Sequence, residues 1–172
     1  MANANTIYRA KKAATLTNPT SASNFVTSDD STKAVVVYFP VLTSGTLSAA
    51  FRFRARGHAT TAGSYNLTPA VYYGTSATAA SNTSIAAASA QAIATTTASW
   101  IIEGTLYWDG TAKTLNGAYW ALNGSTAVIT AWAATTVVTS VDLTTAGNGL
   151  SVVNTLATGG SCYLDELTLE VL

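Results

Sequence analysis

Residues 99–124 read SWIIEGTLYWDGTAKTLNGAYWALNG, and this stretch decides the fold class. One face of its first half carries residues suited to a core, namely Trp100, Ile102, Gly104, Leu106 and Trp108. The other face is mostly polar, with Ser99, Glu103, Thr105 and Asp109. A period of two residues is typical of a half-buried β-strand. The segment 109–113, DGTAK, favours a turn, so Thr114 to Asn123 is expected to return as the second arm of a β-hairpin.

Similar alternating or β-branched segments recur along the chain, separated by turn residues. They predict strands at Thr6 to Ala10, Lys33 to Leu42, Thr46 to Ala59, Tyr65 to Tyr73, the second half of 75–97, Ala127 to about Val138, Leu150 to Leu156 and Cys162 to Val171. Capped segments with a helical period are nearly absent. The expected fold class is therefore all-β: an antiparallel two-sheet sandwich, jelly-roll-like, of about eight to ten strands, with a closed barrel as the alternative.

The length of 172 residues fits a single globular domain with its own core. Within it, residues 1–32 are expected to form an N-terminal strand and a polar arm, because turn residues cluster at Asn18-Pro19 and at 28–31. Residues 33–172 are expected to form the β-sandwich. Pro69 interrupts a predicted strand, which indicates a sheet edge or a bulge at that point.

Charged residues are scarce: the chain has 8 Lys and Arg and 8 Asp and Glu, and 48% of its residues are hydrophobic. Because active sites need converging titratable groups, this composition argues against an enzyme. The formal net charge of zero gives no sign of nucleic-acid binding. Asn, Gly, Ser and Thr interrupt the long uncharged stretches, so no membrane span is expected either. The composition favours a structural or surface protein.

The few residues with catalytic or metal-binding chemistry are isolated in the sequence. His58 is the only histidine and Cys162 the only cysteine, so neither a catalytic triad nor a transition-metal cluster is expected, and no cofactor is implied. Cys162 lies in a strand-like run and is expected to be buried. Glu103 and Asp165 are the best pair for a glycoside hydrolase, which needs two carboxylates. Structural roles for both acids, including ion pairs with Arg52 or Arg54, are the favoured interpretation.

Basic residues gather in the first third of the chain. Residues 1–56 contain seven of them, Arg9, Lys11, Lys12, Lys33, Arg52, Arg54 and Arg56, against two acidic residues, Asp29 and Asp30. The three arginines fall on one face of a predicted strand, where like charges repel unless acids compensate them. Glu103 or Glu166 could supply that compensation within the chain. Alternatively, this row and the basic arm of Arg9, Lys11 and Lys12 bind an acidic patch on a partner.

The four tryptophans divide into two pairs. Trp100 and Trp108 share a face with Ile102 and Leu106, so we expect them in the core. Trp120 and Trp132 alternate less cleanly and are the candidates for exposed positions. Exposed aromatic rings on a sandwich face can stack on sugar rings, which makes these two residues the candidate sugar-stacking pair.

Residues 99–124, together with FRFRARGHATTAGSYNLTPAVYYG at 51–74, resemble the jelly-roll structural proteins of tailed bacteriophages. The resemblance implies a decoration or cement protein that binds the major capsid protein on the outer surface of the virion after synthesis in the host cytoplasm. Symmetric capsid sites make a homotrimer the expected form. The closing segment SCYLDELTLEVL, at 161–172, also resembles the last strand of jelly-roll carbohydrate-binding modules. That resemblance implies the alternative function, a carbohydrate-binding module or a phage receptor-binding head.

Overall fold

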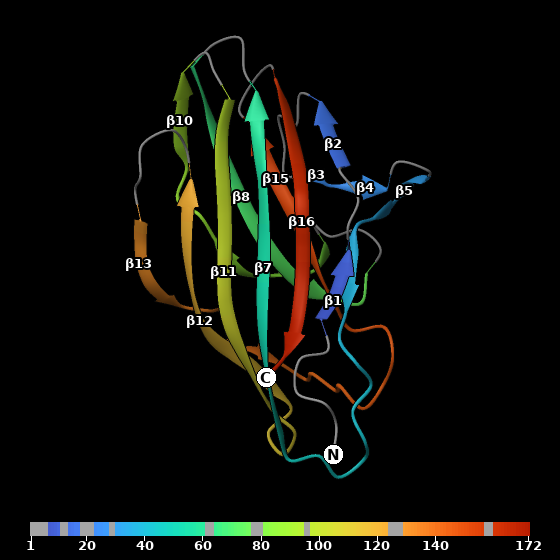
Figure 1. The fold of residues 1–172 in the computed structure, drawn as a ribbon. Coiled ribbons are helices and arrows are strands. Elements are labelled where there is room, and N and C mark those ends of the chain that lie inside the picture. Colours follow the sequence, from blue (N-terminus) through green and yellow to red (C-terminus); the bar gives the residue numbers. More distant parts are fainter. Residues whose placement is uncertain are drawn as a thin grey trace.

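The computed structural model describes residues 7–10, 14–17, 23–27, 30–60, 64–76, 81–94, 97–123, 129–156 and 160–172. Within these ranges the regular elements are β-strands, and every pair of neighbouring strands is antiparallel. Two sheets pack face to face as a sandwich (Figure 1). The expected all-β, two-sheet fold is therefore confirmed. No helix in the described ranges is long and apolar enough to cross a membrane.

The larger sheet forms the front layer in Figure 1 and has four long strands at its centre. Its spatial order is β1 (Ile7–Ala10), β16 (Ser161–Val171), β7 (Ser48–Thr60), β11 (Thr97–Asp109), β12 (Thr114–Asn123) and β13 (Ile129–Ala134). Two short strands lie off this path: β2 (Ala14–Thr17) pairs with β16, and β14 (Val138–Thr139) pairs with β12.

The smaller sheet covers the inner face of the larger one. Its spatial order is β10 (Gln91–Ala94), β8 (Ser64–Gly74), β15 (Gly149–Leu156) and β3 (Ser23–Asn24), with β9 (Thr83–Ala87) beside β8 and β6 (Val36–Tyr38) beside β15. A separate two-stranded ladder joins β4 (Val26–Thr27) to β5 (Asp30–Ala34).

The hairpin predicted from residues 99–124 is present with the expected register. β11 and β12 pair continuously from Trp100 opposite Asn123 to Asp109 opposite Thr114. The Asp109 carboxylate closes the turn by accepting hydrogen bonds from the backbone amides of Thr111 and Ala112, at 2.8 and 2.9 Å. Local turn chemistry and strand alternation therefore specify the same hairpin.

The core lies between the two sheets and takes the inward residues of every long strand. On β7 the inward set includes Phe51, Phe53 and Ala55, all fully buried. Trp100 and Trp108 are also buried, as expected, and the Trp108 indole Nε1 donates to the Val141 carbonyl at 2.9 Å. Gly57 makes room for Trp100, because a Cβ at position 57 would lie 2.6 Å from the indole ring.

Several predicted strand boundaries are wrong. The expected strand from Lys33 to Leu42 is two strands, β5 and β6, which break at Val35, where the backbone amide donates to the Phe25 carbonyl at 2.7 Å. The expected strand from Ala127 to Val138 is likewise divided into β13 and β14. Residues expected to form only a polar connection contribute β2, β3 and β4. β2 and β3 pair with the distant strands β16 and β15, which local alternation does not reveal.

Pro69 lies in β8, an inner strand of the smaller sheet rather than an edge. On one side of β8 the partner changes at this point, from β10 opposite Leu67 to β9 opposite Ala70. The Pro69 carbonyl points to that side and accepts from the Ala88 amide at 3.0 Å. The N–H and C=O of one strand residue point the same way. Pro69 has no N–H, and the side of β8 on which it would donate is the gap between β9 and β10, so no strand hydrogen bond is lost there.

The expected division of the domain at residue 32 stays a prediction. β1 and β2 pair with β16, and β3 pairs with β15. The described part of the arm is therefore joined to both sheets by strand pairing.

Candidate functional site

The outer face of the larger sheet, which points away from the smaller sheet, carries the charged residues of the four central strands. We call its paired charges the charge ladder. Each basic side chain on β7 meets an acid from a neighbouring strand. The pairs are Arg52 Nη1 with Glu170 Oε2 at 3.6 Å, Arg54 Nε with Glu103 Oε2 at 3.8 Å, Arg56 Nε with Glu166 Oε2 at 2.7 Å, and His58 Nδ1 with Asp165 Oδ2 at 3.1 Å.

Strand register produces this compensation. Arg56 lies directly opposite Glu166 on β16, and Arg54 directly opposite Glu103 on β11. Opposite charges at such positions attract at close range. The glutamates therefore offset the repulsion among the arginines, and no acidic partner is needed for that purpose. The contacts that form are therefore those of the first alternative, in which Glu103 and Glu166 compensate the arginines within the chain. A partner-binding role for Arg52, Arg54 and Arg56 stays a prediction.

The basic arm is only partly described. Arg9 lies in β1, where its backbone is opposite Thr168 on β16. Lys11 and Lys12 lie outside the described residues. Their expected role in partner binding stays a prediction as well.

Arg54 is the least satisfied cation of the charge ladder. Its Nε atom is buried and has no hydrogen-bond partner. The 3.8 Å ion pair with Glu103 exceeds hydrogen-bond length, whereas the 2.7 Å contact of Arg56 with Glu166 is within it. Because the Nε of Arg54 is buried, an additional polar contact to the pair of Arg54 and Glu103 would have to reach Glu103 or the exposed part of the Arg54 side chain, which is 42% exposed.

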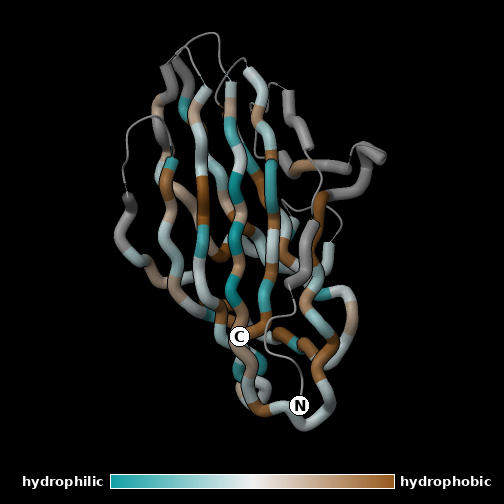
Figure 2. The backbone as a smooth tube through the Cα atoms, viewed as in Figure 1, coloured by the Kyte–Doolittle hydropathy of each residue, from teal (hydrophilic) through white to brown (hydrophobic). Residues whose placement is uncertain are grey.

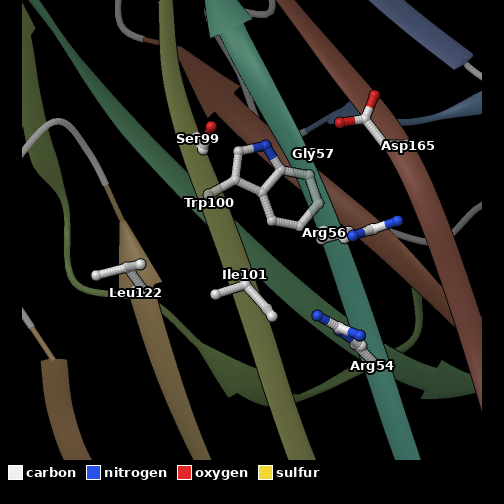
Figure 3. Close-up of a pocket in the computed structure, with 8 residues that line it drawn as sticks. All are labelled: Arg54, Arg56, Gly57, Ser99, Trp100, Ile101, Leu122 and Asp165. Atoms are coloured by element: carbon white, nitrogen blue, oxygen red, sulfur yellow. The ribbon is translucent and has the colours of Figure 1, made fainter. Parts of the chain in front are cut away.

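A shallow groove of about 560 Å³ crosses the outer face beside this pair. Figure 3 shows Ile101 and Leu122 on neighbouring strands at one side, and Arg54, Arg56 and Asp165 at the other. Ile101 and Leu122 are opposite each other in the register of β11 and β12, and both are half-buried. The groove thus has an aliphatic side and a charged and polar side.

Trp120 and Trp132 lie on neighbouring strands at the β13 edge of the larger sheet. The pairing of β12 with β13 shifts between Tyr119, opposite Ala133, and Ala121, opposite Thr130. Trp120 therefore lies opposite two residues of β13, which form a β-bulge that includes Trp132. Trp132 is 65% exposed and Trp120 is half-buried. The sequence singled out both residues; their spatial proximity depends on the bulge, which alternation alone did not reveal.

The candidate catalytic residues do not form a shared centre. Glu103 is on β11 and Asp165 on β16, with β7 between these strands, and each acid has its own cationic partner, Arg54 and His58. The His58 ring also stacks on Tyr163, with ring centroids 4.3 Å apart. In the part of the chain that the structure describes, no group of three or more His, Cys, Asp or Glu residues could hold a metal ion.

Cys162 is fully buried on the inner side of β16, as the sequence predicts. Burial raises the pKa of its thiol to about 12, because desolvation disfavours the thiolate. The thiol is therefore suited to packing and poorly suited to nucleophilic chemistry.

A second surface feature lies at the end of the sandwich that holds the turn after β11. Here three large apolar side chains are exposed: Leu47, Tyr107 and Leu172. We call this set the apolar end. Figure 2 shows hydrophobic segments gathered around this end, near the C-terminus. The sequence alone carries no signal for it, because its members come from three separate segments that only the fold brings together.

No protein-family model matches the chain, and a search of curated proteins finds no match. Among solved structures, the chain is similar to arcelin-5, a lectin-like defense protein from Phaseolus vulgaris, over 98% of each chain at 8% sequence identity and a TM-score of 0.36.

Proposed function

We propose that this chain is a non-enzymatic structural protein of a virion, a decoration protein that binds the outer surface of a tailed-phage head and stabilises it. The observation that carries the proposal is the apolar end. Soluble monomers rarely expose contiguous apolar patches, and such patches are typical of protein interaction surfaces. A decoration protein requires a surface of this kind, because it acts through contacts with capsid subunits and needs no reaction centre.

The centre of the apolar end is well ordered by backbone contacts. Tyr107 is opposite Ala50 in the register of β11 and β7, and the Leu172 amide donates to the Ala50 carbonyl at 3.0 Å. Leu47 is tied to the adjacent turn, because its carbonyl accepts from the Gly110 amide at 2.8 Å. These contacts place Leu47, Tyr107 and Leu172 around one point at 73%, 54% and 49% exposure.

Burying these side chains against a partner would be favourable. Removing apolar surface from water contributes about 25 cal/mol per Å², and full burial of a Leu or Tyr-sized side chain contributes on the order of 2 kcal/mol. Interfaces also depend on a few large anchors near their centre, and tyrosine is enriched among such anchors. Leu47 and Tyr107 are the strongest anchor candidates of this surface.

The identity of the partner follows from the resemblance of residues 51–74 and 99–124 to phage jelly-roll structural proteins. The partner is then the major capsid protein, and the site of action is the outside of the head. A homotrimer suits local threefold positions of a capsid, where one protein can bridge several capsomers.

The direct test is co-sedimentation with purified, expanded heads that lack this chain. Wild-type protein is expected to sediment with the heads, and the double substitution Leu47→Ser with Tyr107→Ser is expected to lose most of that binding. Trp132→Ser is the matched control, because it removes an exposed aromatic residue away from the apolar end. Absence of wild-type binding, or equal binding by the double variant with an unchanged circular dichroism spectrum, would contradict the proposal.

A further inference from the structure

We infer that the outer face of the larger sheet holds a binding site for a neutral saccharide chain, running from the groove beside Arg54 to Trp132. This inference goes beyond the proposed attachment to a head and uses a different part of the surface. The apolar end, which includes Tyr107 near one end of the outer face, would attach the protein, whereas the part of that face between Arg54 and Trp132 would remain available to a second ligand.

Trp132 supplies the first observation. Its indole is 65% exposed on β13, the last strand of its sheet. Trp120 lies on the adjacent strand at the bulge and adds a second, half-buried indole to the same region. Flat apolar ring faces beside hydrogen-bonding edges suit sugar rings, which also have an apolar face and polar edges. The two indoles therefore form one end of the site.

The strand register places polar groups beside the two indoles. Trp120 is opposite Glu103, and Glu103 is opposite Arg54, so these residues form a line across β12, β11 and β7. With about 4.8 Å between neighbouring strands, the line from Trp132 to Arg54 spans about 14 Å. A ligand of several linked rings would therefore meet aromatic faces first, then a carboxylate acceptor, and then a guanidinium donor.

The groove lies next to this line of residues, farther along the same strands. Ile101 and Leu122 lie two residues from Glu103 and Trp120 along their strands, and they form the aliphatic side of the groove. Ser99, Arg56 and Asp165 add hydroxyl, guanidinium and carboxylate groups to its lining. Such pairing of an apolar surface with a few polar groups is typical of small-molecule sites.

The charges of the face select for a neutral ligand. The three arginines of the charge ladder face three glutamates, Glu103, Glu166 and Glu170, so these three pairs sum to zero, and Asp165 beside His58 adds one further carboxylate. A polyanion would gain from the arginines but would be repelled by the adjacent carboxylates. Hydroxyl groups both donate and accept, so they can bind both members of a pair such as Arg54 and Glu103 without leaving either charge unpaired. The Arg54 side chain is 42% exposed, so part of it is accessible to such a ligand.

The test uses cellohexaose, chitohexaose and xylohexaose as neutral probes, and hexagalacturonate as the acidic probe. Binding is followed by tryptophan fluorescence and by calorimetry. At least one neutral probe is expected to bind, and Trp132→Ala is expected to weaken its binding by about fivefold to tenfold, as the loss of one stacking contact predicts. Tyr107→Ala is the matched control, because it removes an exposed aromatic residue on a different strand, β11, away from the groove. It should change the affinity less than twofold.

Glu103→Gln tests the selection by charge. Removing one carboxylate leaves the arginines in excess, so the affinity for hexagalacturonate is expected to rise relative to the neutral probes. Failure of all three neutral probes to bind, equal affinity of the Trp132→Ala variant, or tighter binding of hexagalacturonate than of every neutral probe by the wild type would overturn the inference. Head binding by the Trp132→Ala variant should be unchanged, which separates this result from the test of the proposed function.

Discussion

The side chain of Asn123 connects the two sheets. Its Nδ2 atom donates to the carbonyl of Leu67 at 2.8 Å and to the carbonyl of Ser89 at 3.0 Å. Asn123 ends β12 in the larger sheet, whereas Leu67 belongs to β8 in the smaller one. With 5% of its surface exposed, Asn123 makes these bonds away from water. It therefore fixes the end of the central hairpin against the opposite sheet.

Replacing Asn123 with Ala is expected to lower the free energy of unfolding by about 1–3 kcal/mol, because two carbonyls lose a buried donor. Chemical denaturation measures this difference. Asn116→Ala is the control, since Asn116 lies on the same strand but on the half-exposed outer face. Equal effects of the two substitutions would show that the Asn123 contacts do not connect the sheets as described.

Stability is expected to fall in alkaline solution because two buried acids keep their protons in the folded state. Burial raises the pKa of Cys162 from 9.0 to about 12, and burial followed by the charge of Asp142 raises the pKa of Tyr73 from 10.0 to about 12. The unfolded chain loses these protons first, so the stabilisation is complete below pH 9 and decreases between pH 9 and 12. Melting curves of wild type, Cys162→Ala and Tyr73→Phe should converge as the pH rises through that window; a constant difference would argue against this linkage.

The arginine row is expected to contribute to stability rather than to head binding. The double substitution Arg54→Gln and Arg56→Gln removes two ion pairs of partly exposed groups, which should cost about 1 kcal/mol or less in total. The folded fraction should still sediment with heads, because the apolar end is intact. Loss of head binding at an unchanged melting temperature would instead assign docking to this row.

Self-association is expected without any covalent link. The sole cysteine is buried, so a trimer would depend on surface burial alone. Light scattering at micromolar concentration should give the mass of three chains, with or without reductant. A stable monomer, or a mass that changes when reductant is added, would contradict this prediction.

The sequence predicted those parts of the fold whose signals are local. Alternation placed β7, β11, β12, β15 and β16 to within two residues at each end, and it assigned Trp100 and Trp108 to the core. It could not predict the break at Val35, which follows from a hydrogen bond to Phe25, ten residues earlier in the chain. Nor could it predict the inner position of Pro69, which depends on where two other strands meet β8.

The candidate sites divide in the same way. Glu103 and Glu166 were foreseen as partners of the arginine row because strand alternation places opposite charges on one face. The pairing of Arg52 with Glu170 and the bulge beside Trp120 depend on cross-strand register, for which a single sequence gives no direct signal. The apolar end combines Leu47, Tyr107 and Leu172 from distant segments, so only the folded chain shows it.

The measurement that tests the central claim most directly is a density map of the purified virion in which this chain is located. The account predicts three copies around local threefold positions on the outside of the head, with Leu47, Tyr107 and Leu172 facing the capsid protein and Trp132 pointing to solvent. Density for the chain only in the tail, inside the head, or attached to the head through Trp132 would contradict it.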